Sequence, residues 1–242
     1  MSNELNVRSF NLVIFDLDGV IVDMVECLKR ALIDGIKNYS LAANADVILI
    51  DLAGLIEKLQ ATAIPKTILN ANELFDVEYL NSQDLTVLKK LEIASYIYSR
   101  FKKYKDESAI LYPRVEELVR ILSKKKKLAI LTNNKKSSAL KTLKKFDLEK
   151  YFDEKHVYGF DETGKLKPEP DGLLKILKDM RIRNTKAIFI GDMVTDVIAG
   201  NRAGIRTICV LSGLSRKEDL EKENPYLIIN DIQDLFSILE ID

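Results

Sequence analysis

Ten residues near the start of the chain read Asn11-Leu12-Val13-Ile14-Phe15-Asp16-Leu17-Asp18-Gly19-Val20. The apolar run before Asp16 is short, rich in β-branched and aromatic residues, and followed closely by glycine, which predicts a buried parallel strand. Ligands of open α/β sheets bind beyond the carboxyl ends of the strands, so Asp16 and Asp18 would share the mouth of a site. Two carboxylates this close repel each other unless a cation or a proton intervenes. An Asp-Leu-Asp-Gly turn without chemical function is the alternative interpretation.

The composition limits the possible partners. The chain has 242 residues, of which 47% are hydrophobic, 37 are basic and 37 are acidic. This length supports one large domain or a domain with a second one inserted. Balanced charge argues against nucleic acid or an anionic membrane surface as a partner. We expect a soluble cytoplasmic protein, because residues 1–10 do not resemble a signal peptide and no apolar stretch is long enough to span a bilayer.

The few sulfur and imidazole side chains limit the possible chemistry. Cys27 and Cys209 are the only cysteines and have no paired spacing, which predicts two small buried residues in a reducing compartment. His156 is the only histidine, so no site can use two, and we expect it to be structural. A metal site would therefore consist of oxygen ligands, which favours Mg²⁺ over zinc.

Two regions of different pattern follow the first strand. Residues 24–108 carry apolar side chains at helical spacing, interrupted at Pro65 and at 70–72, and predict an insertion of several helices. Asp23 is placed to cap the first of them. From residue 109 onward, strands alternate with helices, which implies a parallel sheet covered on both faces. The predicted strands are 128–131, 156–160, 187–190, 205–210 and 227–229, and the predicted helices include one opened by Tyr112-Pro113, one over 137–146 and one beginning at Ile232.

Polar side chains follow three of the predicted strands at what should be one edge of the sheet. They are Asp16 and Asp18, Thr132 and Asn133, and Asp192 and Asp196, with Lys167 in a loop that can reach the same edge. Acids, a hydroxyl, an amide and one cation, without a catalytic histidine or thiol, are the groups needed to handle a phosphate. Each has a simpler alternative: a capping turn, one exposed lysine among many (Lys165 competes for the position), or acids at a helix N-terminus.

Four motifs together resemble the haloacid dehalogenase superfamily. They are Asp16-Leu17-Asp18-Gly19-Val20, Leu131-Thr132-Asn133, Lys167-Pro168 and Gly191-Asp192-Met193-Val194-Thr195-Asp196. The resemblance covers residues 8–23 and 109–242, and it points to the branch of phosphoglycolate phosphatases and β-phosphoglucomutases. It implies a Rossmann-like α/β core of residues 1–23 and 109–242, with an inserted α-helical cap domain at 24–108. The chain departs from the common pattern at Met24 and Leu166, which affects specificity more than mechanism.

The resemblance also implies a role for each residue. Asp16 would be the nucleophile that forms an aspartyl-phosphate, and Asp18 the acid and base. Mg²⁺ would be held by Asp16, the main-chain carbonyl of Asp18 and Asp192. Asp196 would orient a metal-bound water or bind the ion directly, and we favour the orienting role. The phosphate would be bound by Thr132, Asn133 and Lys167, and Lys167 would also stabilise the transition state.

The acid at position 18 favours phosphoryl transfer from oxygen, because dehalogenases of the superfamily lack an acid there. We therefore expect a Mg²⁺-dependent phosphatase acting on a small phosphorylated metabolite, a phosphoglycolate-like ester or a sugar phosphate. A phosphomutase of β-phosphoglucomutase type uses the same two acids and remains the alternative. A non-catalytic binding module on the same fold is a third hypothesis. Lys58, Lys66 and Arg100 are cations of the insertion that could meet a substrate carboxylate. The sequence is compatible with either a monomer or a homodimer.

Overall fold

The computed structural model describes residues 10–41 and 85–239. The chain divides into two compact units, a core unit of Met1–Val22 and Leu111–Asp242 and a helical unit of Asp23–Ile110. Much of the helical unit, residues 42–84, lies outside the described residues, together with Lys58 and Lys66. The cap domain proposed for residues 24–108 therefore stays a prediction.

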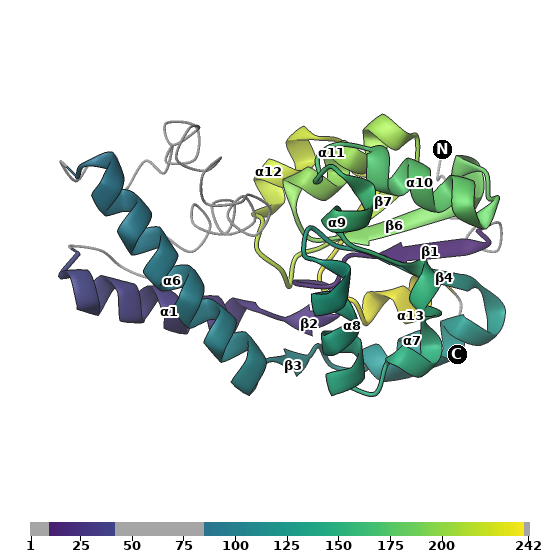
Figure 1. Ribbon diagram of the computed structural model, residues 1–242. Coiled ribbons are helices and arrows are strands. Elements are labelled where there is room, and N and C mark those ends of the chain that lie inside the picture. Colours follow the sequence, from purple (N-terminus) through teal and green to yellow (C-terminus); the bar gives the residue numbers. More distant parts are fainter. Residues whose placement is uncertain (1–9, 42–84, 240–242) are drawn as a thin grey trace. The chain divides into compact units, whose positions relative to one another are not determined.

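The core unit is built on one six-stranded sheet in the order β5-β4-β1-β6-β7-β8, and every neighbouring pair is parallel (Figure 1). The strands are β1 (Leu12–Phe15), β4 (Lys127–Leu131), β5 (Val157–Tyr158), β6 (Ala187–Gly191), β7 (Arg206–Val210) and β8 (Leu227–Ile229). β1 and β6 are buried along their whole length, as expected for strands covered on both faces. The predicted parallel α/β sheet is confirmed.

Helices cover both faces of this sheet, with α10 and α11 on one side and α7 and α13 on the other (Figure 1). On the first side, Leu12 and Ile14 of β1 pack with Phe189 of β6, with α10 and with α11 in one apolar cluster. Because side chains alternate along a strand, Val13 and Phe15 face the opposite side. The helices are α7 (Val115–Lys125), α8 (Lys136–Lys145), α9 (Phe160–Thr163), α10 (Asp171–Met180), α11 (Val194–Ala203), α12 (Lys217–Lys222) and α13 (Asp234–Ile238).

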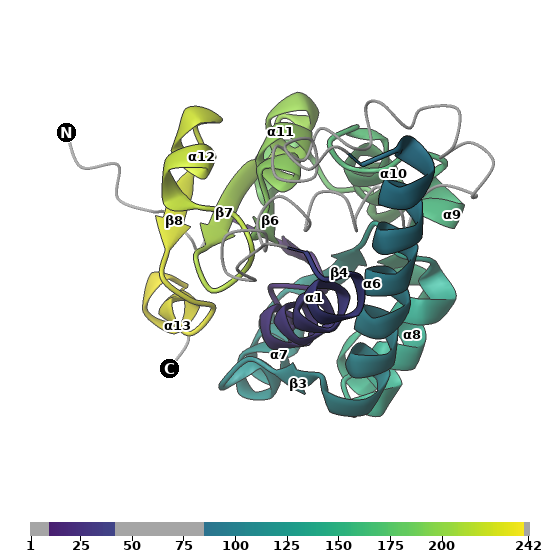
Figure 2. The ribbon, with the colours of Figure 1, turned by 90° about the vertical axis from the view of Figure 1, so that its left-hand side faces the viewer.

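The described part of the helical unit consists of α1 (Val25–Tyr39) packed against α6 (Val87–Ser108) (Figure 2). The Asp23 carboxylate accepts the Val25 N–H at 3.0 Å, so it binds the first N–H of the helix, although Met24 and not Asp23 occupies the N-cap position. Arg100 donates to Asp34 at 2.6 Å and to the Tyr104 hydroxyl at 2.7 Å, so its half-buried guanidinium is bound by groups of this helix pair. The chain enters and leaves the unit through β2 (Val22–Asp23) and β3 (Ile110–Leu111), which pair with each other.

Some predicted boundaries are wrong. The strand expected over 156–160 is only Val157–Tyr158, because Phe160 already begins α9. Pro113 lies before α7 rather than inside it, since the helix starts at Val115 after Arg114 adopts a left-handed φ of 60°. The last helix begins at Asp234, two residues later than expected.

Two other expectations concern burial and membranes. Cys27 and Cys209 are buried and form no disulfide, as predicted. Within residues 10–41 and 85–239, no helix is both long and apolar enough to cross a bilayer.

Candidate active site

At β1 the order in which successive strands are added to the sheet reverses. The chain runs from β1 to β4 and β5 on one side, and then returns to β6 on the other. In an open α/β sheet this arrangement leaves a crevice for ligands. Phe15 is level with Ile130 of β4 and Ile190 of β6, so Asp16, Thr132 and Asp192 follow at one edge. The predicted convergence of the three strand ends is therefore present.

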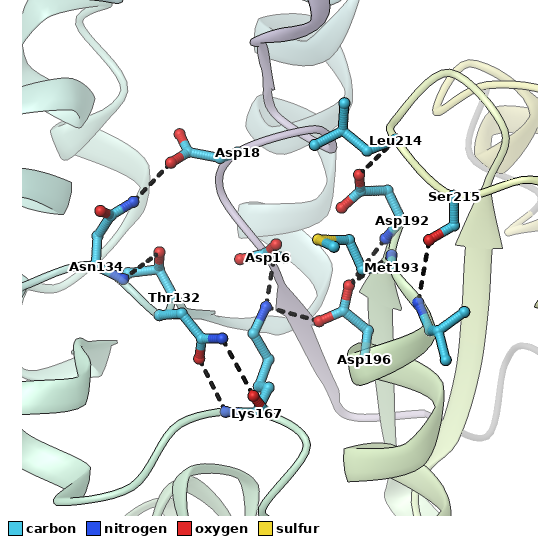
Figure 3. A network of polar contacts seen from close by, with 12 residues as sticks. Asp16, Asp18, Thr132, Asn134, Lys167, Asp192, Met193, Asp196, Leu214 and Ser215 are labelled. Atoms are coloured by element: carbon cyan, nitrogen blue, oxygen red, sulfur yellow. Dashed lines mark hydrogen bonds and ion pairs between the residues drawn. The ribbon is translucent and has the colours of Figure 1, made fainter. Parts of the chain in front are cut away.

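Lys167 lies between two carboxylates beneath this edge (Figure 3). Its Nζ is 3.1 Å from Asp16 Oδ2 and 2.6 Å from Asp196 Oδ1. The Lys167 side chain is only 2% exposed, whereas that of Lys165, its competitor in the sequence, is 56% exposed and pairs with Asp171. A buried cation needs buried anions, so this geometry distinguishes Lys167 from a solvated lysine.

Asn133 fixes the main chain of Lys167. Its Oδ1 accepts the Lys167 N–H at 2.9 Å and its Nδ2 donates to the Lys167 carbonyl at 3.3 Å. The amide side chain thus spans both polar groups of one residue, an arrangement that an amide can make and a carboxylate cannot. The sequence predicted a phosphate contact for Asn133 and missed this contact with the lysine.

Three buried acids could together hold a metal ion. Asp16, Asp192 and Asp196 each offer a carboxylate oxygen, and these oxygens lie within 4.8 Å of one another. Asp192 is 1% exposed, and its Oδ1 is buried without a hydrogen-bond partner, while its Oδ2 accepts the Leu214 N–H at 3.0 Å. Burial, reinforced by Asp196 and Asp16, raises the pKa of the Asp192 carboxyl well above its ordinary value. An orphaned buried oxygen in an all-oxygen donor set fits a hard cation such as Mg²⁺.

Asp196 is already bound by protein groups at both oxygens. Oδ2 accepts the N–H groups of Asp192 at 3.0 Å and Met193 at 2.9 Å, and Oδ1 accepts from Lys167. These contacts tie the start of α11 to the lysine. They suit a residue that orients the metal site better than one that surrenders an oxygen to the ion.

Two glycines allow the chain to approach Asp192 closely. A Cβ on Gly19 would lie 2.3 Å from Asp192 Oδ2, and Gly19 also has a left-handed φ of 87°. A Cβ on Gly213 would lie 2.1 Å from the same oxygen. Any side chain at either position would collide with the carboxylate, so both glycines define where Asp192 can sit.

Thr132 and Asp18 are linked through Asn134. The Thr132 hydroxyl oxygen accepts the Asn134 N–H at 3.1 Å, which leaves its own proton to be donated elsewhere. The Asn134 Nδ2 donates to Asp18 Oδ2 at 2.6 Å (Figure 3). All seven residues predicted from the sequence therefore lie at the carboxyl edge or directly below it.

Asn134 and the segment that follows β7 were not predicted as site residues from the sequence. That segment contacts the site through Gly213, through Leu214, and through Ser215, whose hydroxyl accepts the Val194 N–H at 3.2 Å. A signal was available for both. Asn134 extends the polar run that ends β4, and residues 212–215 follow the carboxyl end of the next parallel strand along the sheet.

Known proteins resemble the chain in sequence and in structure. A family model described as "Haloacid dehalogenase-like hydrolase" matches residues 13–210. The "Putative pyrophosphatase PpaX" of Caldanaerobacter subterraneus subsp. tengcongensis is 33% identical over 153 residues, which are 62% of this chain and 69% of the relative. The "Phosphoglycolate phosphatase" of Pseudomonas savastanoi pv. phaseolicola is 27% identical over 233 residues, 93% of this chain and 78% of the relative.

Among solved structures, a HAD family hydrolase from Deinococcus radiodurans R1, crystallised with phosphate and sodium, superposes with a TM-score of 0.73 at 18% identity. The superposition covers 96% of both chains, and at this identity it establishes the fold alone. The match to the family model, over residues 13–210, spans most of the chain and contains all seven site residues. The chain belongs to the haloacid dehalogenase-like hydrolase family.

Proposed function

We propose that the protein is a Mg²⁺-dependent phosphatase that hydrolyses small phosphate monoesters through an aspartyl-phosphate on Asp16. The observation that carries the proposal is the Asp16 carboxylate at the end of β1, held 3.1 Å from the buried Lys167 ammonium and grouped with two further buried acids. A carboxylate needs no deprotonation to attack phosphorus at neutral pH. The phosphatase names of the two relatives support the reaction class.

In the first step, an oxygen of Asp16 bonds to phosphorus while the bond from phosphorus to the ester oxygen breaks. The carboxyl proton of Asp18 passes to the departing oxygen, so the alcohol leaves neutral. In the second step, a water oxygen bonds to the phosphorus of the aspartyl-phosphate and gives one proton to the Asp18 carboxylate, while the bond between phosphorus and the Asp16 oxygen breaks and the Asp16 carboxylate is restored. Inorganic phosphate departs, and both acids return to their starting states.

The remaining residues hold the phosphoryl group and the metal. Thr132 would donate its hydroxyl proton to a phosphate oxygen, the Asn133 main-chain N–H to another, and Lys167 would stabilise charge on the transferred group. Asp16, the Asp18 carbonyl and Asp192 would hold Mg²⁺, with Asp196 orienting them. When bound, Mg²⁺ would offset the negative charge of the carboxylates and of the phosphate.

The substrate class is the finer part of the proposal. The relatives' names offer two chemistries, a small carboxylated monoester and inorganic pyrophosphate. We propose a phosphoglycolate-like ester or a sugar phosphate, since the match to the phosphoglycolate phosphatase spans 93% of this chain and that to the pyrophosphatase 62%.

The test is phosphate release from p-nitrophenyl phosphate, phosphoglycolate, several sugar phosphates and pyrophosphate, with Mg²⁺ and with EDTA. Wild type would be compared with Asp16→Asn and with Asp219→Asn, an acid that pairs with Lys222 on the surface. Release that requires Mg²⁺, disappears in Asp16→Asn and persists in Asp219→Asn supports the proposal. Equal release from wild type and Asp16→Asn would remove Asp16 as the nucleophile. If no ester is hydrolysed, isomerisation of a sugar phosphate would indicate the phosphomutase, and its absence a binding module.

A further inference from the structure

Asn134 lies outside the four motifs, yet its side chain forms a hydrogen bond with Asp18 of the first motif. We propose that Asn134 is a positioning residue that orients the Asp18 carboxyl for proton transfer to the leaving group, an inference that rests on the proposed phosphatase function. The Asn134 Nδ2 donates to Asp18 Oδ2 at 2.6 Å. Asp18 sits in the turn after β1 and Asn134 after β4, so the bond joins two neighbouring strand ends (Figure 3).

Hydrogen bonds on both sides of its main chain hold Asn134 in place. Its N–H donates to the Thr132 hydroxyl at 3.1 Å, and its carbonyl accepts the Phe160 N–H at 3.0 Å. The main chain at Gly159 packs closely against Asn134, because a Cβ at Gly159 would lie 2.6 Å from the Asn134 carbonyl oxygen. These contacts fix the main chain that carries the amide, so the donor reaches Asp18 from a position that is set before substrate arrives.

The bond selects which oxygen of Asp18 does the chemistry. Oδ2 accepts the amide hydrogen, which fixes the rotation of the carboxyl plane and leaves the transferable proton on Oδ1 of the same group. In the first step that proton moves from Oδ1 to the ester oxygen as the bond from phosphorus to oxygen breaks. Without Asn134 the carboxyl can rotate, and the fraction of encounters with correct geometry falls.

This role makes a prediction that differs between substrates. An alkoxide is a poor leaving group and depends on the acid, whereas p-nitrophenolate leaves without a proton. A loss of orientation at Asp18 should therefore slow alkyl esters much more than p-nitrophenyl phosphate. A loss of packing or of phosphate binding would slow both equally.

The experiment measures kcat/KM in Mg²⁺ for an alkyl monoester, glycerol phosphate, and for p-nitrophenyl phosphate. The variants are Asn134→Ala, which removes the donor, and the nearly isosteric Asn134→Asp, which replaces the donor with a repelling acceptor. Asp18→Asn defines the loss of the acid itself. Asn201→Ala is the matched control, because its amide donates to the Glu223 carbonyl on the exposed side of α11.

For Asn134→Ala we expect kcat/KM to fall about tenfold or more with glycerol phosphate and less than about threefold with p-nitrophenyl phosphate. Asn134→Asp should show a larger difference in the same direction, and Asn201→Ala none. Melting temperatures identify a variant that fails to fold, and the nearly isosteric variant then decides. Equal losses on both esters, no loss, or a gain would overturn the positioning role, provided that Asp16→Asn is inactive and Asp18→Asn loses kcat/KM mainly with glycerol phosphate. If Asp16→Asn stays active, the proposed function itself fails and the inference with it.

Discussion

Replacing Lys167 with methionine tests whether the site depends on a buried counter-charge. The change keeps a long apolar stem and removes the ammonium that lies 3.1 Å from Asp16 and 2.6 Å from Asp196. Breaking a buried ion pair by removing one partner costs about 3–5 kcal/mol. For a chain of this length, that loss corresponds to a melting temperature lower by about 6–20 °C.

The matched control is Lys165→Met. Its side chain is 56% exposed and its ammonium is 3.2 Å from Asp171. An exposed pair of this kind contributes about 0–1 kcal/mol, so the melting temperature should change by less than about 4 °C. Both variants would be melted in EDTA at pH 8, where the remaining acids are most fully charged.

Lowering the pH should narrow the gap between Lys167→Met and wild type. The pKa of Asp192 is raised in the folded protein, and the Lys167 charge opposes that rise. An acid with a raised folded-state pKa contributes stability at low pH and loses it as the pH rises through that pKa. Removing the lysine charge raises the pKa of Asp192 further, so the variant loses more stability at high pH than the wild type does. On acidification the variant should therefore regain more stability than the wild type. Equal melting temperatures for Lys167→Met and Lys165→Met at pH 8 would refute the counter-charge.

Three further changes test the same reasoning. Asp192→Asn should raise the melting temperature in EDTA at pH 8, because the buried carboxylate, whose pKa is raised, is replaced by a neutral amide. The same change should abolish any stabilisation by Mg²⁺, and a Mg²⁺-induced rise in melting temperature that persists in the variant contradicts this. Gly213→Ala places a Cβ 2.1 Å from Asp192 Oδ2 and should weaken Mg²⁺ binding about 10–100-fold. Calorimetric titration measures the affinity, and an unchanged value would mean that Asp192 is not a ligand. Ile14→Ala, at a fully buried position of the central strand, should cost about 2–5 kcal/mol in urea unfolding, and a change below about 1 kcal/mol would place Ile14 outside the core.

Much of the core unit could be predicted because its strands carry strong local signals. Leu12–Phe15 and Ala187–Gly191 are apolar runs that end abruptly in acids, and the parallel sheet forces those ends to one edge. The acids of β1 and β6 therefore meet without any tertiary information. The boundary errors fall where the signal is weak: β5 has only two residues, and Phe160 could as easily extend it as begin α9.

The contacts that orient the site could not be predicted by the same rule. Asn133 binds the Lys167 main chain and Asn134 binds Asp18, yet the two amides are adjacent and chemically identical in the sequence. Their different partners follow from which way each side chain points after the strand ends. Gly213 is likewise one glycine in a surface-like stretch, and only the approach of residues 212–215 to Asp192 shows why a side chain would not fit there.

Charge balance connects these features. Among the described residues, the buried charged side chains are three acids, Asp16, Asp192 and Asp196, and one base, Lys167. Three negative charges against one positive leave a net charge of −2 if every group is ionised, and a net charge of this size is costly inside a protein. A raised pKa at Asp192 relieves part of the cost by holding a proton, and a divalent cation at its orphaned Oδ1 would relieve the whole of it. The proton and the metal then compete for the same carboxylate, because deprotonation is the condition for binding. Burial makes the net charge of −2 costly when no cation is bound. The same burial would therefore favour a doubly charged ion over a singly charged one at this site.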